Sequence, residues 1–180
     1  VRGALIPGID AKATIKNVGI LDSYIDVSTV KNEAYGSAFA AYVKNWREEY
    51  ELKEENYPVI SGCFVDTSVI VRGNFAGGMV SGTPSPIKIE DSYFVGKLIG
   101  GSRCGAILGN AFGPDSIIRN CYACTADFDQ VVDGRGDLIA AGNTYENVYT
   151  FGVAVGLGVS FVNADNMCGV NAKSGMPGLD

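Results

Sequence analysis

The sequence predicts an all-β fold, namely a parallel, right-handed β-helix or solenoid of about five coils with one short helical insertion. Three observations lead to this prediction. Glycine accounts for 24 of the 180 residues and recurs at corresponding places along the chain. Two sequence landmarks alternate through most of the chain. The segments between them are short and rich in β-branched and aromatic residues, as strands are.

The first landmark is a six-residue frame that begins at Ile15 and reads Ile-Lys-Asn-Val-Gly-Ile. It recurs from Ile60, Ile89 and Ile118, and in weaker form from Tyr145. The repeat length is about 29 residues, and the first interval is longer because it holds an insertion of about 16 residues. Similarity at a nearly constant period marks a repeat architecture, so each frame predicts one equivalent strand position.

The second landmark is an apolar turn flanked by glycine. It is clearest at residues 77–82, 104–110 and 136–143, with looser versions at residues 3–8 and 36–42. Two landmarks in strict alternation make chance similarity a poor explanation. We therefore expect one frame and one glycine turn in every coil.

Strands explain the remaining segments better than helices do. Residues 65–71 and 93–99 are short, and they lack the apolar spacing of an amphipathic helix. Copies that run in one direction at a period of about 29 residues cannot pair through two-residue hairpins. They can stack as parallel strands about 4.8 Å apart, each coil burying its inward residues against its neighbours.

The middle of the frame predicts the corner of each coil. The corner position holds residues that tolerate left-handed backbone geometry, and stacked asparagines can hydrogen-bond from copy to copy. The residue after it is small enough for a crowded interior. The corner residues are Asn17, Gly62, Asp91, Asn120 and Asn147, and the interior residues after them are Val18, Cys63, Ser92, Cys121 and Val148. We expect Ile15, Ile60, Ile89 and Ile118 to stack inward in adjacent coils.

The pattern I-x-N-[C/V], followed by a glycine-flanked apolar turn, resembles the GLUG-type repeats of bacterial surface proteins. The resemblance spans about residues 3–150 and is best at residues 3–6 and 13–18. The turns at residues 78–81 and 136–139 depart from the pattern. The resemblance implies a β-solenoid in a surface-exposed, bacterial setting and carries no active-site residue across.

Composition narrows the function classes. The net charge is −6, and an acidic surface repels a phosphate backbone, so we expect no nucleic-acid partner. The chain has no histidine, which excludes a Ser-His-Asp triad and any His-ligated metal site within it. No apolar run approaches the ~20 residues of a membrane-spanning helix. We expect one domain over residues 1–180, with a C-terminal capping or tail region at about 151–180, within a longer, extracellular or cell-surface polypeptide.

Neither the cysteines nor the acidic cluster indicates a catalytic or metal site. Cys121 and Cys124 lie three apart on a predicted strand and so point to opposite faces, unlike a redox pair or zinc ligands. Cys63 and Cys121 occupy equivalent positions two coils apart, about 10 Å, beyond the reach of a disulfide. We expect both to be reduced and buried. Residues Asp127, Asp129 and Asp133 are similar to the acidic clusters of β-helix lyases, but solvated surface carboxylates explain them better. We expect no catalytic residue, metal or cofactor.

The insertion at about residues 44–57 is the most unusual segment, because charged and aromatic residues are mixed only there. Trp46, Tyr50, Glu54 and Tyr57 have the spacing of a stripe on one face of a short helix. One interpretation is that this stripe packs on the flank of the solenoid. The other is that Trp46, Tyr50 and Tyr57 contact a glycan or a protein, as large aromatic side chains commonly do.

The sequence favours a non-catalytic, cell-surface or secreted β-solenoid module that acts as a spacer or an adhesin-like binding element. Two alternatives use the same scaffold: a polysaccharide lyase or glycoside hydrolase, and a phage tail-fibre segment, which would be an obligate trimer. Five coils make a stack of only about 25 Å, which is short for a polysaccharide cleft. The partners that we expect are a glycan or a surface protein.

Overall fold

The computed structural model describes residues 2–29, 34–111, 115–124, 143–151 and 167–169. Within these residues the regular secondary structure is β-strand, apart from two short 3-10 helices. Every strand pair in the described residues is parallel. The prediction of an all-β protein with parallel sheets is therefore confirmed.

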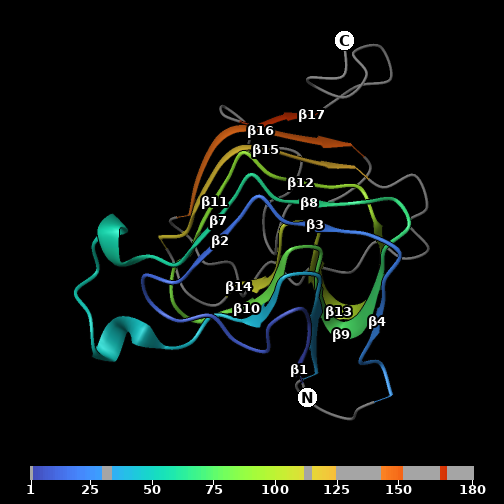
Figure 1. Cartoon of the computed structure of the whole chain (residues 1–180), viewed down its shortest axis with the longest axis horizontal. Coiled ribbons are helices and arrows are strands. Elements are labelled where there is room, and N and C mark those ends of the chain that lie inside the picture. The colour runs from blue at the N-terminus through green and yellow to red at the C-terminus, as the bar shows by residue number, and fades with distance from the viewer. Residues whose placement is uncertain (1, 30–33, 112–114, 125–142, 152–166, 170–180) are drawn as a thin grey trace.

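The strands form three sheets, which we name by their number of described strands (Figure 1). The nine-stranded sheet contains β2 (Thr14–Lys16), β3 (Gly19–Ile20), β7 (Val59–Ser61), β8 (Phe64–Val65), β11 (Lys88–Glu90), β12 (Tyr93–Phe94), β15 (Ile117–Cys124), β16 (Thr144–Phe151) and β17 (Met167–Gly169). The five-stranded sheet contains β1 (Arg2–Gly3), β4 (Tyr24–Asp26), β5 (Tyr35–Ser37), β9 (Ile70–Gly77) and β13 (Lys97–Gly105). The three-stranded sheet contains β6 (Ala40–Tyr42), β10 (Val80–Thr83) and β14 (Leu108–Ala111).

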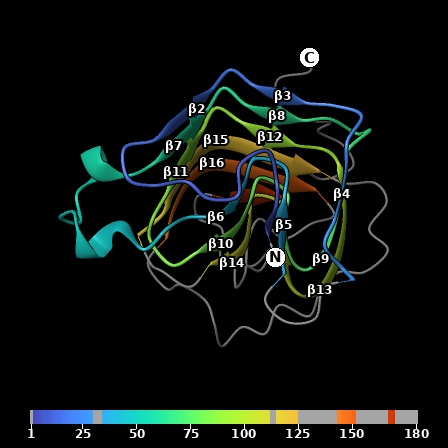
Figure 2. The ribbon, with the colours of Figure 1, turned by 60° about the horizontal axis from the view of Figure 1, so that its bottom comes forward.

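The chain visits the three sheets in a constant order. From β7 it runs through the nine-stranded sheet, then the five-stranded sheet in β9, then the three-stranded sheet in β10, and it returns to the nine-stranded sheet in β11. The next round through β12, β13, β14 and β15 repeats this order. Figure 2 shows the successive rounds lying one behind another. The round from β7 to β10 thus pairs with both the preceding and the following round of the chain.

The strand pairing aligns the predicted six-residue frames of successive rounds with one another. Ile15 lies opposite Ile60, Ile60 opposite Ile89, Ile89 opposite Ile118, and Ile118 opposite Tyr145. The side chains of Ile60, Ile89 and Ile118 are fully buried, and Ile15 is half-buried. The prediction that these four isoleucines stack in adjacent strands is confirmed.

The predicted corner is also present. Asn17, Asp91, Asn120 and Asn147 have φ angles between 50° and 57°, and Gly62 has a φ of 62°. Asparagine, aspartate and glycine reach this left-handed region at the lowest cost. The side-chain amide of Asn147 donates to Oδ1 of Asn120 at 3.1 Å, and that of Asn120 donates to Oδ1 of Asp91 at 3.0 Å. The corner residues Asp91, Asn120 and Asn147 therefore form a hydrogen-bonded ladder over three successive rounds.

The glycine-flanked apolar turns at residues 36–42, 77–82 and 104–110 lie in the core, where the chain leaves the five-stranded sheet for the three-stranded sheet. The looser turn at residues 3–8 exposes Leu5, and nearly all of the predicted turn at residues 136–143 lies outside the described residues. Phe39, Met79 and Ile107 occupy these turns in successive rounds and are fully buried. A Cβ atom at Gly78 would collide with the carbonyl oxygen of Ala106 in the next round. Glycine is required there because the backbones of neighbouring rounds approach so closely.

Candidate functional site

The insertion between β6 and β7 forms two separate turns of 3-10 helix, η1 (Trp46–Glu48) and η2 (Glu54–Asn56). The prediction of one short helix is wrong. The backbone N–H of Tyr50 donates to the carbonyl oxygen of Trp46 at 3.0 Å, but the chain is extended at Lys53. The break lets residues at both ends of the insertion reach the same part of the core, which one straight helix would not allow. Figures 1 and 2 show the insertion projecting from one side of the sheets.

Trp46 and Tyr57 belong to the core. Trp46 is 1% exposed and Tyr57 is 7% exposed, and their ring centroids are 5.6 Å apart. The indole N–H of Trp46 donates to the carbonyl oxygen of Pro86 at 3.2 Å. Burial raises the pKa of the Tyr57 phenol. This placement favours packing over ligand contact for both rings.

Tyr50 is the exposed member of the predicted aromatic stripe. Its side chain is 38% exposed, and Nζ of Lys12 lies 5.3 Å from the centroid of its ring. Leu52 in the same insertion is 49% exposed. The structure therefore does not bring Trp46, Tyr50 and Tyr57 together on one surface. Ligand binding by these residues stays a prediction, and Tyr50 is the one that presents its ring to solvent.

Polar contacts fasten the insertion to the flank of the sheets. Nη2 of Arg47 lies 3.0 Å from Oδ2 of Asp115, just before β15. The hydroxyl of Ser85 donates to Oδ1 of Asn45 at 3.3 Å. Together with the Trp46 contact to Pro86, these bonds join η1 to the segments that precede β11 and β15. The insertion thus packs against two successive rounds of the chain.

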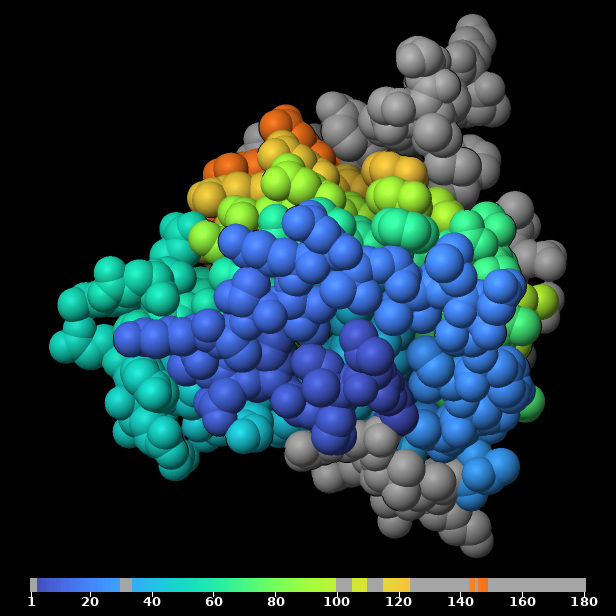
Figure 3. Space-filling model, in the orientation of Figure 1, coloured from blue at the N-terminus to red at the C-terminus, as the bar shows by residue number. Residues whose placement is uncertain are grey.

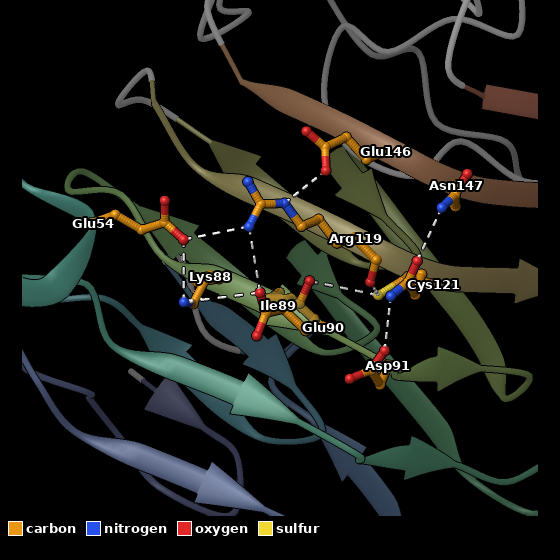
Figure 4. Close-up of polar contacts among 10 residues, drawn as sticks. Glu54, Lys88, Ile89, Glu90, Asp91, Arg119, Cys121, Glu146 and Asn147 are labelled. Atoms are coloured by element: carbon orange, nitrogen blue, oxygen red, sulfur yellow. Dashed lines mark hydrogen bonds and ion pairs between the residues drawn. The ribbon is translucent and has the colours of Figure 1, made fainter.

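A network of charged side chains joins η2 to the nine-stranded sheet (Figure 4). We call Glu54, Lys88, Glu90, Arg119 and Glu146 the charged ladder. Nζ of Lys88 lies 3.2 Å from Oε1 of Glu54 and 3.8 Å from Oε1 of Glu90. Arg119 lies 3.4 Å from Glu54 and 3.7 Å from Glu90 through Nη1, and 2.8 Å from Glu146 through Nε.

Each acidic member of the charged ladder is paired with a cation, although its three carboxylates outnumber its two cations. All three carboxylates contact a cation, so none is a bare acid poised against a second acid as in a glycosidase. Four of its members come from adjacent strands β11, β15 and β16, and Glu54 comes from the insertion. Its geometry suits attachment of the insertion to the sheet. Sequence reasoning missed this cluster because Glu54 lies 34 residues from Lys88.

A second group that sequence reasoning missed is an aromatic ladder, Phe64, Tyr93 and Tyr122. The centroid distances are 5.3 Å and 4.7 Å, and the interplanar angles are 18° and 6°. All three follow the corner by two residues, and this repeated position is the signal that could have revealed them. Because the ring faces cover one another, the ladder offers solvent mainly ring edges. It therefore stabilises the stack and is poorly suited to sugar stacking.

The two described cysteine side chains occupy the interior. Cys63 and Cys121 are free and buried, and Ser92 lies between them in the stack. The backbone N–H of Cys63 donates to the Ser92 hydroxyl at 3.0 Å. Desolvation raises the pKa of the Cys121 thiol to about 12. The predicted burial and register of the pair are confirmed, and Cys121 is protonated at neutral pH.

Several predicted features lie outside the described residues: the acidic cluster Asp127, Asp129 and Asp133, and nearly all of the C-terminal region at about 151–180. Among the described residues, no group of three or more histidine, cysteine or acidic side chains could hold a metal ion. The helices that the structure describes are also too short and too polar to cross a membrane.

The comparisons with known proteins identify no relative for this chain. The sequence matches no family model, and neither the curated proteins nor the solved structures contain a match to it.

Proposed function

We propose that the chain is a stretch of right-handed parallel β-solenoid of about five coils, and that it serves as a non-catalytic spacer or adhesin-like binding element. The observation that carries this proposal is the shared register of the rounds. Equivalent positions in successive repeats face one another in both larger sheets, as Ile60 faces Ile89 and Ile70 faces Lys97. Repetition of one round, with each copy paired to the next along its length, is the defining feature of a solenoid. One register shift, between Gly100 and Arg103, interrupts the pairing of β9 with β13.

Repeated contacts along the stack suit a spacer. The isoleucine stack, the corner ladder, the charged ladder and the aromatic ladder all run from round to round. Each round is therefore held mainly by its neighbours, so that length can change by whole coils without a new kind of contact. The charged ladder and Trp46 attach the insertion to this scaffold. A projecting insertion that is attached at both of its turns, with Tyr50 and Leu52 exposed, is a suitable place for a binding contact.

The cellular setting rests on the resemblance to GLUG-type repeats. We propose an extracellular or cell-surface location in a bacterium, with a glycan or a surface protein as partner. The exposed Tyr50 ring supports a glycan, because aromatic rings offer apolar faces to sugar rings.

Deleting one complete coil tests the architecture. Removal of residues 87–115, one whole repeat, joins Pro86 to Ser116 and keeps the register, and it makes Cys63 and Cys121 neighbours in adjacent coils. Their Cα atoms would then lie about 5 Å apart, within disulfide range. Mild oxidation should crosslink Cys63 to Cys121 in the deletion variant and not in the parent, as mass spectrometry would show.

Deletion of residues 88–115, which is shorter by a single residue, is the matched control. It leaves one extra residue where Ile87 joins Ser116, so this variant should fold less stably than the whole-repeat deletion, because the extra residue must bulge out for the strands to keep their register. If the whole-repeat deletion destabilises the protein as much as the shorter one, the solenoid proposal is wrong.

The proposed function is tested separately from the architecture. The chain should release no unsaturated product and no new reducing ends from a panel of acidic and neutral polysaccharides. On a glycan array, Tyr50→Ala should lose any binding that the parent shows while its melting temperature is unchanged. Turnover that disappears in Asp127→Ala/Asp129→Ala would establish the enzyme alternative, and a stable trimer in sedimentation would favour the tail-fibre alternative.

A further inference from the structure

The first round lies at one end of the stack, and no described segment covers its strands β2, β3 and β4. We call the open edge of these three strands the step. β1 lies beside β5, and Ile6 pairs with Ala40 of β6, so the chain itself continues over that part of the first round. β2, β3 and β4 pair with neighbours on one side only, and no described segment lies on the other side. In Figure 3 the residues of this first round (blue) lie open on the face turned to the viewer.

The step presents core side chains to solvent. The partly buried apolar residues that pack against the core all belong to the first round, and four of them lie on or beside the step: Ile15, Val18, Ile20 and Ile25. Their counterparts in the next round are at most 1% exposed: Ile60, Cys63, Val65 and Val71. The difference arises because a further round covers the counterparts, whereas no round among the described residues covers the step. The shape that would bury the step is therefore another round in the same register.

At the corner of the step, the side-chain amide of Asn17 is placed to donate a hydrogen bond to an acceptor in a preceding round. Within the ladder each amide donates to the corner oxygen of the preceding round, as Asn147 does to Asn120 and Asn120 to Asp91. The side-chain oxygen of Asn17 is the first atom that a Cβ added at Gly62 would meet, and the side-chain amide nitrogen is not among the nearest atoms, so the oxygen is the side that Asn17 turns to the next round. No acceptor for this amide occurs among the described residues. An aspartate or asparagine at the corner of a preceding round would supply one.

The charge beside the corner is also complementary to a coil of this repeat. Lys16 lies opposite Ser61 and, one round further, Glu90. A segment with the sequence of residues 87–101, docked one round before β2, would place its glutamate against Lys16 and its aspartate against Asn17. It would place its Ile89 and Leu98 equivalents over Ile15 and Ile25. The inward positions of the step carry no charge that would oppose such a strand.

We propose that the step formed by β2, β3 and β4 binds one further coil of the same repeat, a strand–corner–strand segment that carries aspartate or asparagine at its corner. This proposal rests on the solenoid architecture proposed above. The mode of binding is parallel strand addition, in which main-chain hydrogen bonds supply affinity and the side-chain positions supply specificity. The corner amide and Lys16 make the step selective for an acidic or amide corner over an apolar one.

The test uses the full chain and a synthetic peptide with the sequence of residues 87–101, titrated by fluorescence anisotropy and mapped by hydrogen exchange. We expect saturable binding with slower exchange at residues 14–16 and 19–20. A peptide with leucine at the corner should bind about tenfold more weakly, because a charged hydrogen bond is lost. Asn17→Asp should abolish binding of the aspartate peptide and keep binding of a peptide with asparagine there, which can donate the bond itself. Asp91 adopts the same backbone geometry in the chain, so this variant should fold.

Several outcomes would overturn the proposal. These are the absence of binding to a folded parent chain, exchange protection confined to other strands, and equal affinity for the leucine and aspartate peptides. Self-association of the chain that protects residues 14–20 without peptide would mean that a second copy occupies the step. The coil-deletion experiment distinguishes these failures from failure of the solenoid itself, because crosslinking of Cys63 to Cys121 does not involve the step.

Discussion

Replacing Trp46 with alanine decides between packing and ligand contact for the insertion. The indole is 1% exposed, packs against Tyr57 and donates to the carbonyl oxygen of Pro86. Replacing a buried tryptophan by alanine costs about 3–5 kcal/mol through lost apolar burial and the cavity left behind. The lower end applies here, because the insertion lies at the flank of the molecule and Tyr57 can shift to fill part of the space. We expect a loss of about 3 kcal/mol in the free energy of unfolding.

That loss should appear as a fall of about 6–12 °C in melting temperature, since a chain of this length loses about 2–4 °C per kcal/mol. Thermal unfolding followed by circular dichroism measures it. Tyr50→Ala is the matched control, because it removes an aromatic ring of similar size from an exposed site in the same insertion. This variant should change stability by no more than about 0.5 kcal/mol. If Trp46→Ala melts within about 2 °C of the parent, as about 0.5 kcal/mol would give, the inference that the ring anchors the insertion is wrong.

Three further predictions follow from the ladders. Asn120→Leu should destabilise the protein by about 2–3 kcal/mol in denaturant unfolding, because leucine disfavours the left-handed backbone of the corner and the hydrogen-bonded amide is lost. Asn120→Gly should lose only about 1 kcal/mol, because glycine adopts that backbone freely. Equal losses in the two variants would contradict the role given to the left-handed backbone. Arg119→Met should cost about 1 kcal/mol at low salt and less at high salt, whereas Lys53→Met, which removes an exposed pair, should cost almost nothing. Burial raises the pKa of the Cys121 thiol above its ordinary value of 9.0 to about 12. The contribution of this thiol to stability is therefore intact below pH 9 and is lost as the pH rises toward 12. At pH 8 the thiol of the folded protein should resist iodoacetamide, and rapid alkylation of Cys121 would refute its burial.

The repeat and its corner could be predicted from the sequence alone, because both depend on which residue occupies single positions. A left-handed backbone at every round restricts the corner to glycine, asparagine or aspartate, and crowding restricts the next position to small side chains. These restrictions act on single residues and recur at a constant spacing, so a single sequence displays them. The pairing of Ile15, Ile60, Ile89 and Ile118 followed from the same spacing.

The tertiary structure alone decided what the insertion does. An aromatic spacing that fits a helix face instead serves two 3-10 turns, because the side chain of Trp46 packs against Tyr57 and is held by Pro86, 40 residues away. The charged ladder likewise depends on Glu54 meeting Lys88 and Arg119, 34 and 65 residues away. Contacts at such separations depend on how the insertion folds back on the sheets. A local sequence pattern cannot predict how the insertion folds back, because the packing energy depends on both of the surfaces in contact and not on either segment alone.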